Sequence, residues 1–196
     1  MLNITVRRPL ASKLAAFGLS LAIGAALPAA ALAKNPMVGG APMYASKTIV
    51  ENAVNSKDHT TLVAAVKAAG LVETLKGPGP FTVFAPSDEA FTRLPAGALD
   101  TLLKPESAPT LATIIKYHVV AGAITSEQLK AQITAGGGKA TLTTLAGQPL
   151  IASVGPNGNI ELTDTAGIKA YVDTADIKET NGVVHLTNGM SVPKLG

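Results

Sequence analysis

The spacing of hydrophobic residues divides the chain into a helical part followed by a strand-rich part. Leu62, Val66 and Ala69 recur at helical spacing, so they share one face of a helix. The run Phe81–Ala85 is rich in β formers and follows a Gly-Pro-Gly-Pro stop, which predicts a strand. From Lys139 onward, short β-rich runs alternate with Gly, Pro and Asn. Helices first and strands afterwards predict an α+β domain.

The same pattern gives the expected boundaries of the elements. Thr125 and Gln128 have capping-box spacing at a helix start, Ser87 is a predicted N-cap, and Asp58 and Thr60 offer N-cap oxygens for the helix after them. Helices are expected at residues 48–55, 60–69, 71–75, 88–94, 96–103 and 110–117, and from 126 onward. Strands are expected at residues 81–85, 141–145, 150–154, 159–163, 168–173 and 183–186, with a brief extended segment at 118–120.

The first 33 residues have the pattern of a secretory signal peptide. Arg7, Arg8 and Lys13 form a basic leader, and Ala31–Ala33 is a small-x-small cleavage pattern. The apolar run Leu14–Leu27 is shorter than the roughly 20 residues of a membrane span, so no stable span is expected after cleavage. We therefore expect a signal peptide at 1–33, an irregular arm at 34–45 and one domain at 46–196. The product would be periplasmic, secreted or displayed at the cell surface.

Charge and cysteine content remove several classes of function. The leader holds three of the 16 basic residues and none of the 13 acidic ones, so residues 34–196 carry 13 of each. A formally neutral chain lacks the excess of Lys and Arg that nucleic-acid binding requires. The chain has no cysteine, which excludes disulfides, thiolate catalysis and cysteine zinc sites.

The remaining polar residues show no recognisable catalytic or metal motif. The histidines His59, His118 and His185 lie far apart in the sequence, and no zinc spacing is present. A hydrolase would need Ser87 or Ser153 beside one of these histidines, yet no G-x-S-x-G elbow occurs. We expect no cofactor, no metal and no catalytic activity.

Three segments, in this order and spacing, resemble the fasciclin-like domain family. They are Gly79–Phe91, which matches the first signature of that family, Ile114–His118, which resembles its tyrosine-histidine motif, and Thr180–Leu186, which resembles its second signature. The likeness runs from about Thr48 to Val192. It implies an α+β fold in which two β-sheets form a wedge with several packed helices. It also implies a secreted or surface-displayed adhesion role without catalysis, as in bacterial single-domain members linked to host attachment or symbiosis.

The resemblance also carries candidate interaction residues. In animal matrix relatives, the tyrosine-histidine motif and an Asp-Ile pair are tied to integrin binding, and the matching residues are Tyr117, His118, Asp176 and Ile177. Lys178 stands where those relatives have Leu or Met, so a charge replaces an apolar contact. Structural alternatives remain open: Asp176 as a turn cap, Ile177 as a core anchor, and the histidines as hydrogen-bonded structural residues.

Two functions follow as hypotheses. The first is an exported, non-catalytic module for cell adhesion or protein interaction, which attaches to a host or neighbouring cell. Its partner would be a cell-surface or matrix protein or a polysaccharide, and a homodimer is one way to make a single domain bivalent. The alternative is a protein of the periplasm or cell surface that binds a small apolar ligand such as a lipid, since an aliphatic chain can leave an apolar cleft.

Overall fold

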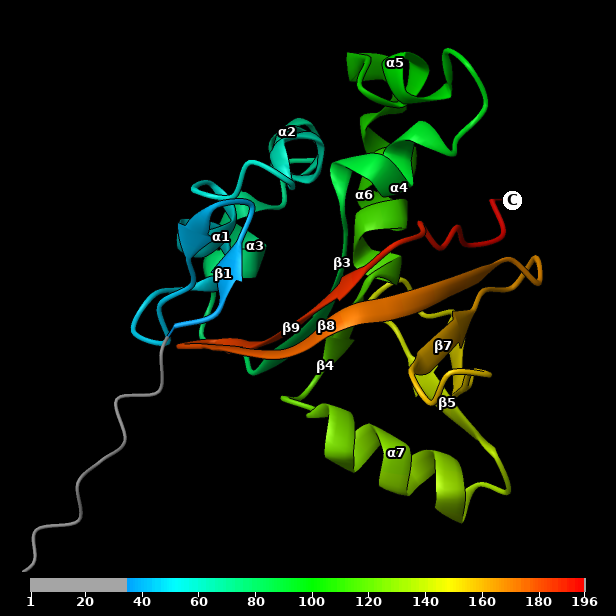
Figure 1. Cartoon of the computed structure of the whole chain (residues 1–196). Helices are drawn as coiled ribbons and strands as arrows, with labels where there is room; N and C mark the ends of the chain where they lie inside the picture. The colour runs from blue at the N-terminus through cyan, green and yellow to red at the C-terminus, as the bar shows by residue number, and fades with distance from the viewer. Residues whose placement is uncertain (1–34, 196) are drawn as a thin grey trace, which may run out of the picture. The chain divides into compact units, whose positions relative to one another are not determined.

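The computed structural model describes residues 35–195 (Figure 1). The signal peptide expected at residues 1–33 lies outside the described residues. Within 35–195, no helix is both long and apolar enough to cross a membrane. The helices are α1 (Ile49–Ala53), α2 (Thr60–Ala68), α3 (Val72–Lys76), α4 (Asp88–Thr92), α5 (Ala98–Leu102), α6 (Ala108–Tyr117) and α7 (Ser126–Ala135), with a 3-10 turn at Pro105–Ser107. The strands are β1 (Met37–Val38), β2 (Ala41–Pro42), β3 (Phe81–Pro86), β4 (Val119–Ala121), β5 (Lys139–Thr143), β6 (Pro149–Val154), β7 (Ile160–Thr163), β8 (Lys169–Glu179) and β9 (Gly182–Thr187).

Strand β8 belongs to two sheets and joins them. Its first part pairs with β7, which continues to β6 and β5, while its second part pairs with β9, which continues to β3 and β4. All of these pairs are antiparallel except β3 with β9, which is parallel. An isolated antiparallel bridge between Val120 and Thr144 links the region after β5 back to β4. The order of strands is therefore a continuous series that bends at β8.

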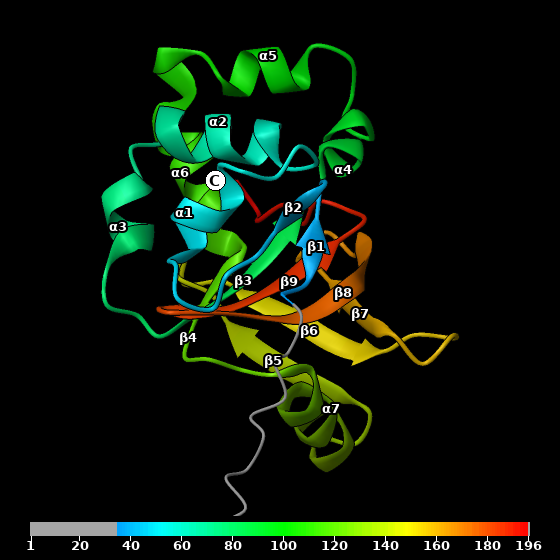
Figure 2. The same cartoon turned by 60° about the vertical axis from the view of Figure 1, so that its left-hand side comes forward.

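Helices cover this series of strands from two sides (Figure 2). Helices α1–α6 lie on one side, where α1–α3 and α6 bury one hydrophobic cluster against β3, β8 and β9. Helix α7 lies on the opposite side, where Leu129 and Ile133 pack on β5–β8 in a second cluster that also contains Phe84 and Tyr117. This arrangement confirms the predicted α+β class.

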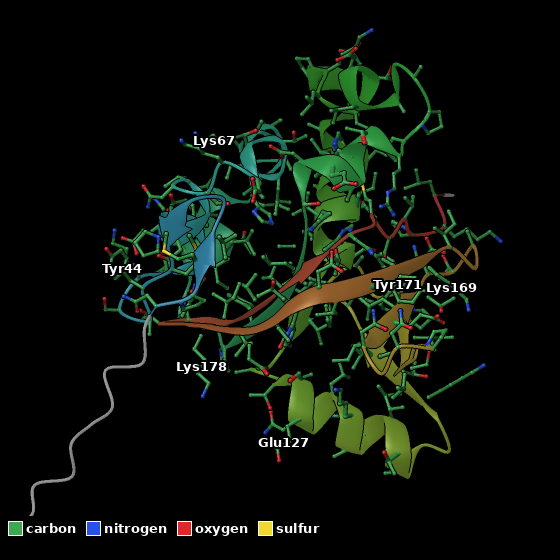
Figure 3. All side chains as sticks on the ribbon, in the orientation of Figure 1. Tyr44, Lys67, Glu127, Lys169, Tyr171 and Lys178 are labelled. Atoms are coloured by element: carbon green, nitrogen blue, oxygen red, sulfur yellow. The ribbon has the colours of Figure 1, made fainter. Side chains whose placement is uncertain are left out.

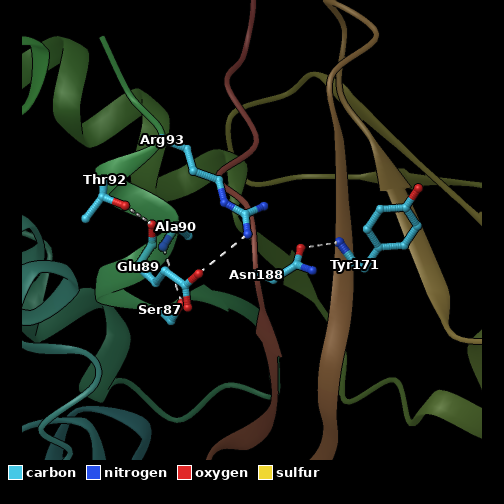
Figure 4. Close-up of polar contacts among 7 residues, drawn as sticks. All are labelled: Ser87, Glu89, Ala90, Thr92, Arg93, Tyr171 and Asn188. Carbon is cyan, nitrogen blue, oxygen red and sulfur yellow. Dashed lines mark hydrogen bonds and ion pairs between the residues drawn. The ribbon is translucent and has the colours of Figure 1, made fainter. Parts of the chain in front are cut away.

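Local sequence signals account for where several helices begin. Thr48 with Glu51, and Thr125 with Gln128, form complete capping boxes at the starts of α1 and α7. The Oγ atom of Ser87 accepts a hydrogen bond from the Ala90 N–H at 3.3 Å and so caps α4 (Figure 4). The N-caps predicted at Ser87 and Thr125 are therefore confirmed.

Helix α2 is capped from outside its own segment. Its N-cap residue, His59, makes no side-chain capping bond. Instead, the Asp88 carboxylate accepts hydrogen bonds from the N–H groups of Thr60 at 3.2 Å and Thr61 at 2.8 Å. Burial opposes ionisation of Asp88, but the hydrogen bond from the Thr60 hydroxyl at 2.6 Å, together with the bonds from Thr61 and the Thr60 N–H, outweighs it and lowers the pKa of Asp88. The expectation that Asp58 or Thr60 caps this helix was wrong, because the Asp88 carboxylate at the start of α4 accepts the hydrogen bonds from the first N–H groups of α2.

The N-terminal arm differs from the irregular segment expected. Gly39 and Gly40 have φ angles of 55° and 77°, and they form the turn of a small hairpin in which Met37 pairs with Pro42. The hairpin places Val38 and Met43 in the first hydrophobic cluster, where each is about 95% buried. The glycine turn and the burial of these two side chains stabilise the hairpin.

Strand β8 continues well past the predicted end at residue 173. Its pairing with β9 shifts register between Val172 and Thr174 and again between Thr174 and Ile177. At Asp176 the backbone has a φ of 63°, a value that residues other than glycine rarely adopt. The bulge breaks the alternation of buried and exposed positions, and alternation is the signal from which a strand is predicted.

Gly182 permits the close approach of β9 to β3. A Cβ atom at this position would lie 2.1 Å from the Phe81 carbonyl oxygen, far inside van der Waals contact. The absence of a side chain at Gly182 therefore lets the two parallel backbones pair.

The packing of α7 on the sheet is testable. Leu129 is fully buried, so Leu129→Ala should lower the free energy of unfolding by about 2–5 kcal/mol. Gln132→Ala on the exposed side of the same helix is the matched control and should change stability by less than about 0.5 kcal/mol. Urea denaturation measures both. Equal effects from the two variants would show that α7 does not pack as described.

Candidate functional site

Tyr117 and His118 end helix α6 inside the protein rather than on its surface. Tyr117 is 0% exposed, and its hydroxyl donates a hydrogen bond to the Pro149 carbonyl at 2.7 Å. Burial, and then the negative charge of Asp164, raise the pKa of Tyr117, so it stays protonated as a donor. Its side chain therefore ties α6 to strand β6 and does not reach solvent.

Both ring nitrogens of His118 are bonded, and the partners fix its tautomer. Ser191 N–H donates to Nε2 at 3.1 Å, so Nε2 is an acceptor. The Ile114 carbonyl lies 2.9 Å from Nδ1, which must then carry the proton. Burial lowers the pKa of His118, in agreement with a neutral ring. His118 thus connects α6 to the C-terminal segment.

Asp176 caps helix α7 across the bulge of β8. Its carboxylate accepts a hydrogen bond from Ser126 N–H at 2.7 Å and a second one from the Ser126 hydroxyl. Burial disfavours the charged form, but the two bonds from Ser126 prevail and lower the pKa of Asp176. A carboxylate at the first N–H groups of a helix is also favoured by the helix dipole.

His185 holds the bulge from the other side. The Asp176 N–H donates to its Nδ1 at 3.2 Å, and its Nε2 lies 2.9 Å from the Ile124 carbonyl. Nδ1 is therefore the acceptor, and Nε2 carries the proton. The ring also stacks on Phe84, with centroids 5.5 Å apart. Burial lowers its pKa and keeps it neutral.

These contacts join the two predicted motifs into one network of buried and half-buried residues. The Phe84 N–H donates to the His118 carbonyl at 2.9 Å, and Phe84 stacks on His185, which accepts from Asp176. We call this set (His118, Phe84, His185, Asp176 and Ser126) the junction. The structure thus brings the two motifs together, while Ile177, 2% exposed, anchors β8 in the first hydrophobic cluster.

The candidate residues differ in how much surface they offer a partner. Tyr117, His118 and Ile177 are buried, and Asp176 is half-buried with its carboxylate engaged by Ser126. Exposed side chains close in sequence to the junction include Lys178 on β8 and Glu127 on α7, which project from neighbouring elements in Figure 3.

The serines considered as nucleophiles have structural partners. Ser87 caps α4, and the Ser153 hydroxyl donates to Glu161 at 3.4 Å, so neither is bonded to a histidine. A serine-histidine contact does occur at Ser56 and His59, 2.9 Å apart, but both residues are 3% exposed. Among residues 35–195, no group of three or more His, Asp or Glu side chains could hold a metal ion.

Sequence reasoning missed the residues that complete the junction. Nothing in the sequence connects Ser126 with Asp176, or Phe84 with His185, because each pair is far apart along the chain. The capping box at Thr125 and Gln128 located the start of α7, and it is the only local signal near Ser126. Asp176, which also caps the start of α7, is brought there by tertiary packing.

A model of the fasciclin domain matches residues 57–193. The chain belongs to the fasciclin domain family. It is 38% identical over 191 residues to Protein sll1483 of Synechocystis sp., and the match covers 94% of this chain and 98% of that protein. Domains of this family are generally non-catalytic adhesion modules.

Animal relatives contain this domain as a small part of a longer protein. The transforming growth factor-beta-induced protein ig-h3 of Sus scrofa is 37% identical over 146 residues, which is 74% of this chain but 19% of that protein. The solved FAS1 domain pair from the insect cell adhesion molecule Fasciclin I aligns with a TM-score of 0.65 and 17% identity. That match covers 76% of this chain and 51% of the other, and it shows a shared fold.

The contribution of Asp176 to stability can be separated into two parts. Asp176→Ala loses both bonds from Ser126 and places Ala at a φ of 63°, so it should cost about 2–3 kcal/mol. Asp176→Gly loses only the bonds and should cost about 1 kcal/mol less than Ala, because Gly accepts this backbone. Urea denaturation compares them with Asp173→Ala, an exposed control on the same strand. A cost for Asp176→Ala no larger than the control would contradict the capping role.

The buried histidines predict acid lability. The pKa values of His59, His118 and His185 are all lowered from 6.5, so below pH 6.5 the unfolded chain binds protons that the folded chain does not. Glu179, with its pKa raised to about 7, binds one proton more when folded and offsets one histidine. Stability should thus fall as the pH drops below 6.5, by about 1.4 kcal/mol per pH unit for each net proton that only the unfolded chain binds. Urea denaturation across pH 5–8 measures the slope, and a flat profile below pH 6.5 would refute the neutral, buried histidines.

Proposed function

We propose that this chain is an exported, non-catalytic module for cell adhesion or protein interaction that attaches its cell to a host or to neighbouring cells. The observation that carries the proposal is the fasciclin domain at residues 57–193, whose solved relative comes from an insect cell adhesion molecule. The compartment would be the periplasm, the cell surface or the extracellular matrix, with symbiosis as one setting. Export rests on the signal-peptide pattern at residues 1–33.

The proposed contact surface lies where β8 and α7 meet. Asp176 fixes the start of α7 against the bulge, and this fixes the exposed Glu127 relative to the exposed Lys178 (Figure 3). Tyr117, His118, Asp176 and Ile177 then serve as positioning residues: they shape the surface and leave the contact to its neighbours. Lys178 suits an acidic group on the partner, a protein carboxylate or an acidic polysaccharide.

A single domain must link two surfaces to cause adhesion. A homodimer would present two copies of the surface around Lys178. A single domain could instead use the N-terminal hairpin for a second contact, since the hairpin lies on the other side of β8 from α7. Two weak contacts made together give an avidity well above either affinity. Modest affinity at each surface is therefore sufficient for the proposed role.

Charge reversal at Lys178 tests this surface. Beads coated with the exported protein should attach to host cells or to the producing bacterium, and Lys178→Glu should reduce the attached number at least fivefold. Lys67→Glu, on α2 and far from Lys178 in Figure 3, is the matched control and should leave attachment unchanged. Urea denaturation must show native stability for both variants.

Three results would go against the proposal in different ways. Attachment no higher than that of bare beads would reject adhesion. Attachment that survives Lys178→Glu would keep adhesion and reject this surface. Equal loss in both lysine variants would show that net charge, and not a specific contact, drives attachment.

A second candidate function is the binding of a small apolar ligand. The observation that favours it is a pocket of about 40 Å³ between α1, α2, α3 and the sheet, lined by apolar side chains apart from Lys67 and His118. Its size suits a short molecule, and a long acyl chain would have to displace a helix. Titration with a short, uncharged, hydrocarbon-rich probe, followed through the methyl NMR signals of Leu62, Val66 and Val83, tests this candidate, and signals that stay unchanged would reject it.

A further inference from the structure

Three asparagines in the sequence are followed directly by glycine, and this pair has a chemistry of its own. They are Asn157, Asn181 and Asn188. The backbone nitrogen of the residue after an asparagine can attack the Cγ atom of the asparagine side chain. A glycine at that position leaves its nitrogen unhindered, because it carries no side chain. The three pairs are alike in sequence, whereas the fold places them in different surroundings.

The side chain of Asn181 is buried and held by three hydrogen bonds. Its Oδ1 accepts from the Ile49 N–H at 3.0 Å, and its Nδ2 donates to the carbonyls of Leu75 at 2.8 Å and Gly77 at 3.0 Å. The following residue, Gly182, pairs with β3 inside the sheet. An attack on this side chain requires the bonds and the pairing to open. Opening of a central strand costs close to the global free energy of unfolding, so Asn181 is strongly protected.

Asn188 is half-buried and bonded to strand β8 through both its side chain and its backbone. Its Oδ1 accepts from the Tyr171 N–H at 3.0 Å, and its own N–H donates to the Tyr171 carbonyl at 3.1 Å (Figure 4). The following Gly189 is buried, and a Cβ atom there would lie 3.0 Å from the Cβ of Ala170. These contacts hold the side-chain carbonyl on β8, so Asn188 must first leave the strand before it can react.

Asn157 lies at the exposed tip of the hairpin formed by β6 and β7. Pro156, Asn157 and Gly158 are all exposed, and a Cβ atom at Gly158 would meet no atom within 4 Å. An exposed side chain changes rotamer within nanoseconds, so the Cγ atom of Asn157 can approach the Gly158 nitrogen. The Gly158 N–H donates to the Gly155 carbonyl at 3.0 Å. A single bond in an exposed turn opens at little cost, so it gives Asn157 little protection.

We propose that Asn157 is a site of spontaneous deamidation in the folded protein, while Asn181 and Asn188 are protected by the fold. The Gly158 nitrogen forms a bond to Cγ of Asn157, and the bond from Cγ to Nδ2 breaks. The side-chain nitrogen leaves as ammonia and takes the amide proton of Gly158 with it. Water then opens the cyclic imide at either of its two carbonyls. The products are aspartate, or isoaspartate in which the backbone runs through the former side chain.

The conversion changes the charge of the protein at one place. Residues 34–196 carry 13 basic and 13 acidic residues, and each conversion adds one further acidic group at the hairpin tip. Because the tip is exposed, the pairing of β6 with β7, which begins at Val154 opposite Ile160, need not change. The protein should therefore accumulate, with age, a form that is more acidic by one charge at a single position.

Ageing of the whole protein at pH 8 tests the proposal. Trypsin releases Asn157 in the peptide 140–169 and the other two asparagines in the peptide 179–194, so their conversion is followed separately. Mass spectrometry detects the replacement of an amide by a carboxyl group, and fragmentation assigns its position. We expect Asn157 to react at least tenfold faster than Asn181 or Asn188, because its turn opens far more readily. The rate should rise with pH, since loss of the Gly158 amide proton creates the nucleophile.

Three controls separate the effect of the fold from that of the sequence. In guanidinium chloride, where the fold is lost, all three Asn-Gly pairs should react at similar rates. Asn159 lies in the same peptide as Asn157 and should stay unmodified, because the β-branched side chain of Ile160 hinders the attacking nitrogen. Asn157→Gln keeps an exposed amide at the tip but lengthens the side chain, which disfavours ring closure. This variant should not develop the acidic form on isoelectric focusing.

Each of three contrary results would overturn the proposal. Equal rates at the three sites in the native protein would show that the fold gives no selective protection. Reaction of Asn157 only in guanidinium chloride would show that the bond from Gly158 to Gly155 keeps the tip closed. An acidic form that still develops in Asn157→Gln would place the modification at another residue.

Discussion

The parallel pairing of β3 with β9 is the constraint on which the rest of this structure depends. It runs from Phe81 opposite Gly182 to Pro86 opposite Thr187, so it joins segments about a hundred residues apart. Only a glycine at 182 allows the two backbones to approach so closely, and the neighbouring Asn181 fixes the register: its side chain accepts from the Ile49 N–H and donates to the carbonyls of Leu75 and Gly77. One pairing thereby places the helical half of the chain against the strand-rich half.

Structure that depends on residues close together in the sequence was predicted well. Contacts between residues far apart in the sequence could not be predicted. The caps at Ser87 and Thr125 were predictable because donor and acceptor belong to one helical turn. The cap of α2 by Asp88 and the second half of β8 were not, because they depend on tertiary contacts and on a bulge that interrupts alternation. The α+β class survived these errors, since it depends only on the order of helices and strands.

At the candidate site, the sequence identified the residues but did not predict their surroundings in the fold. Resemblance identified Tyr117, His118, Asp176 and Ile177, but a motif does not state which way a side chain points. His118 and His185 each use both ring nitrogens to bind backbone groups, so they hold elements together at positions where a misplaced polar atom would be costly. Residues that fix a junction in this way can be essential to a surface without touching anything bound to it.

His59 differs from the other two histidines in the contacts that hold it. All three are buried, and burial lowers the pKa of each. The Nδ1 atom of His59 lies 2.9 Å from the hydroxyl of Ser56, three residues earlier in the chain. His118 and His185 instead each bond a backbone group that is distant in the sequence, Ser191 N–H and the Ile124 carbonyl. His59 therefore orders the loop before α2, whereas the other two histidines hold separate elements together.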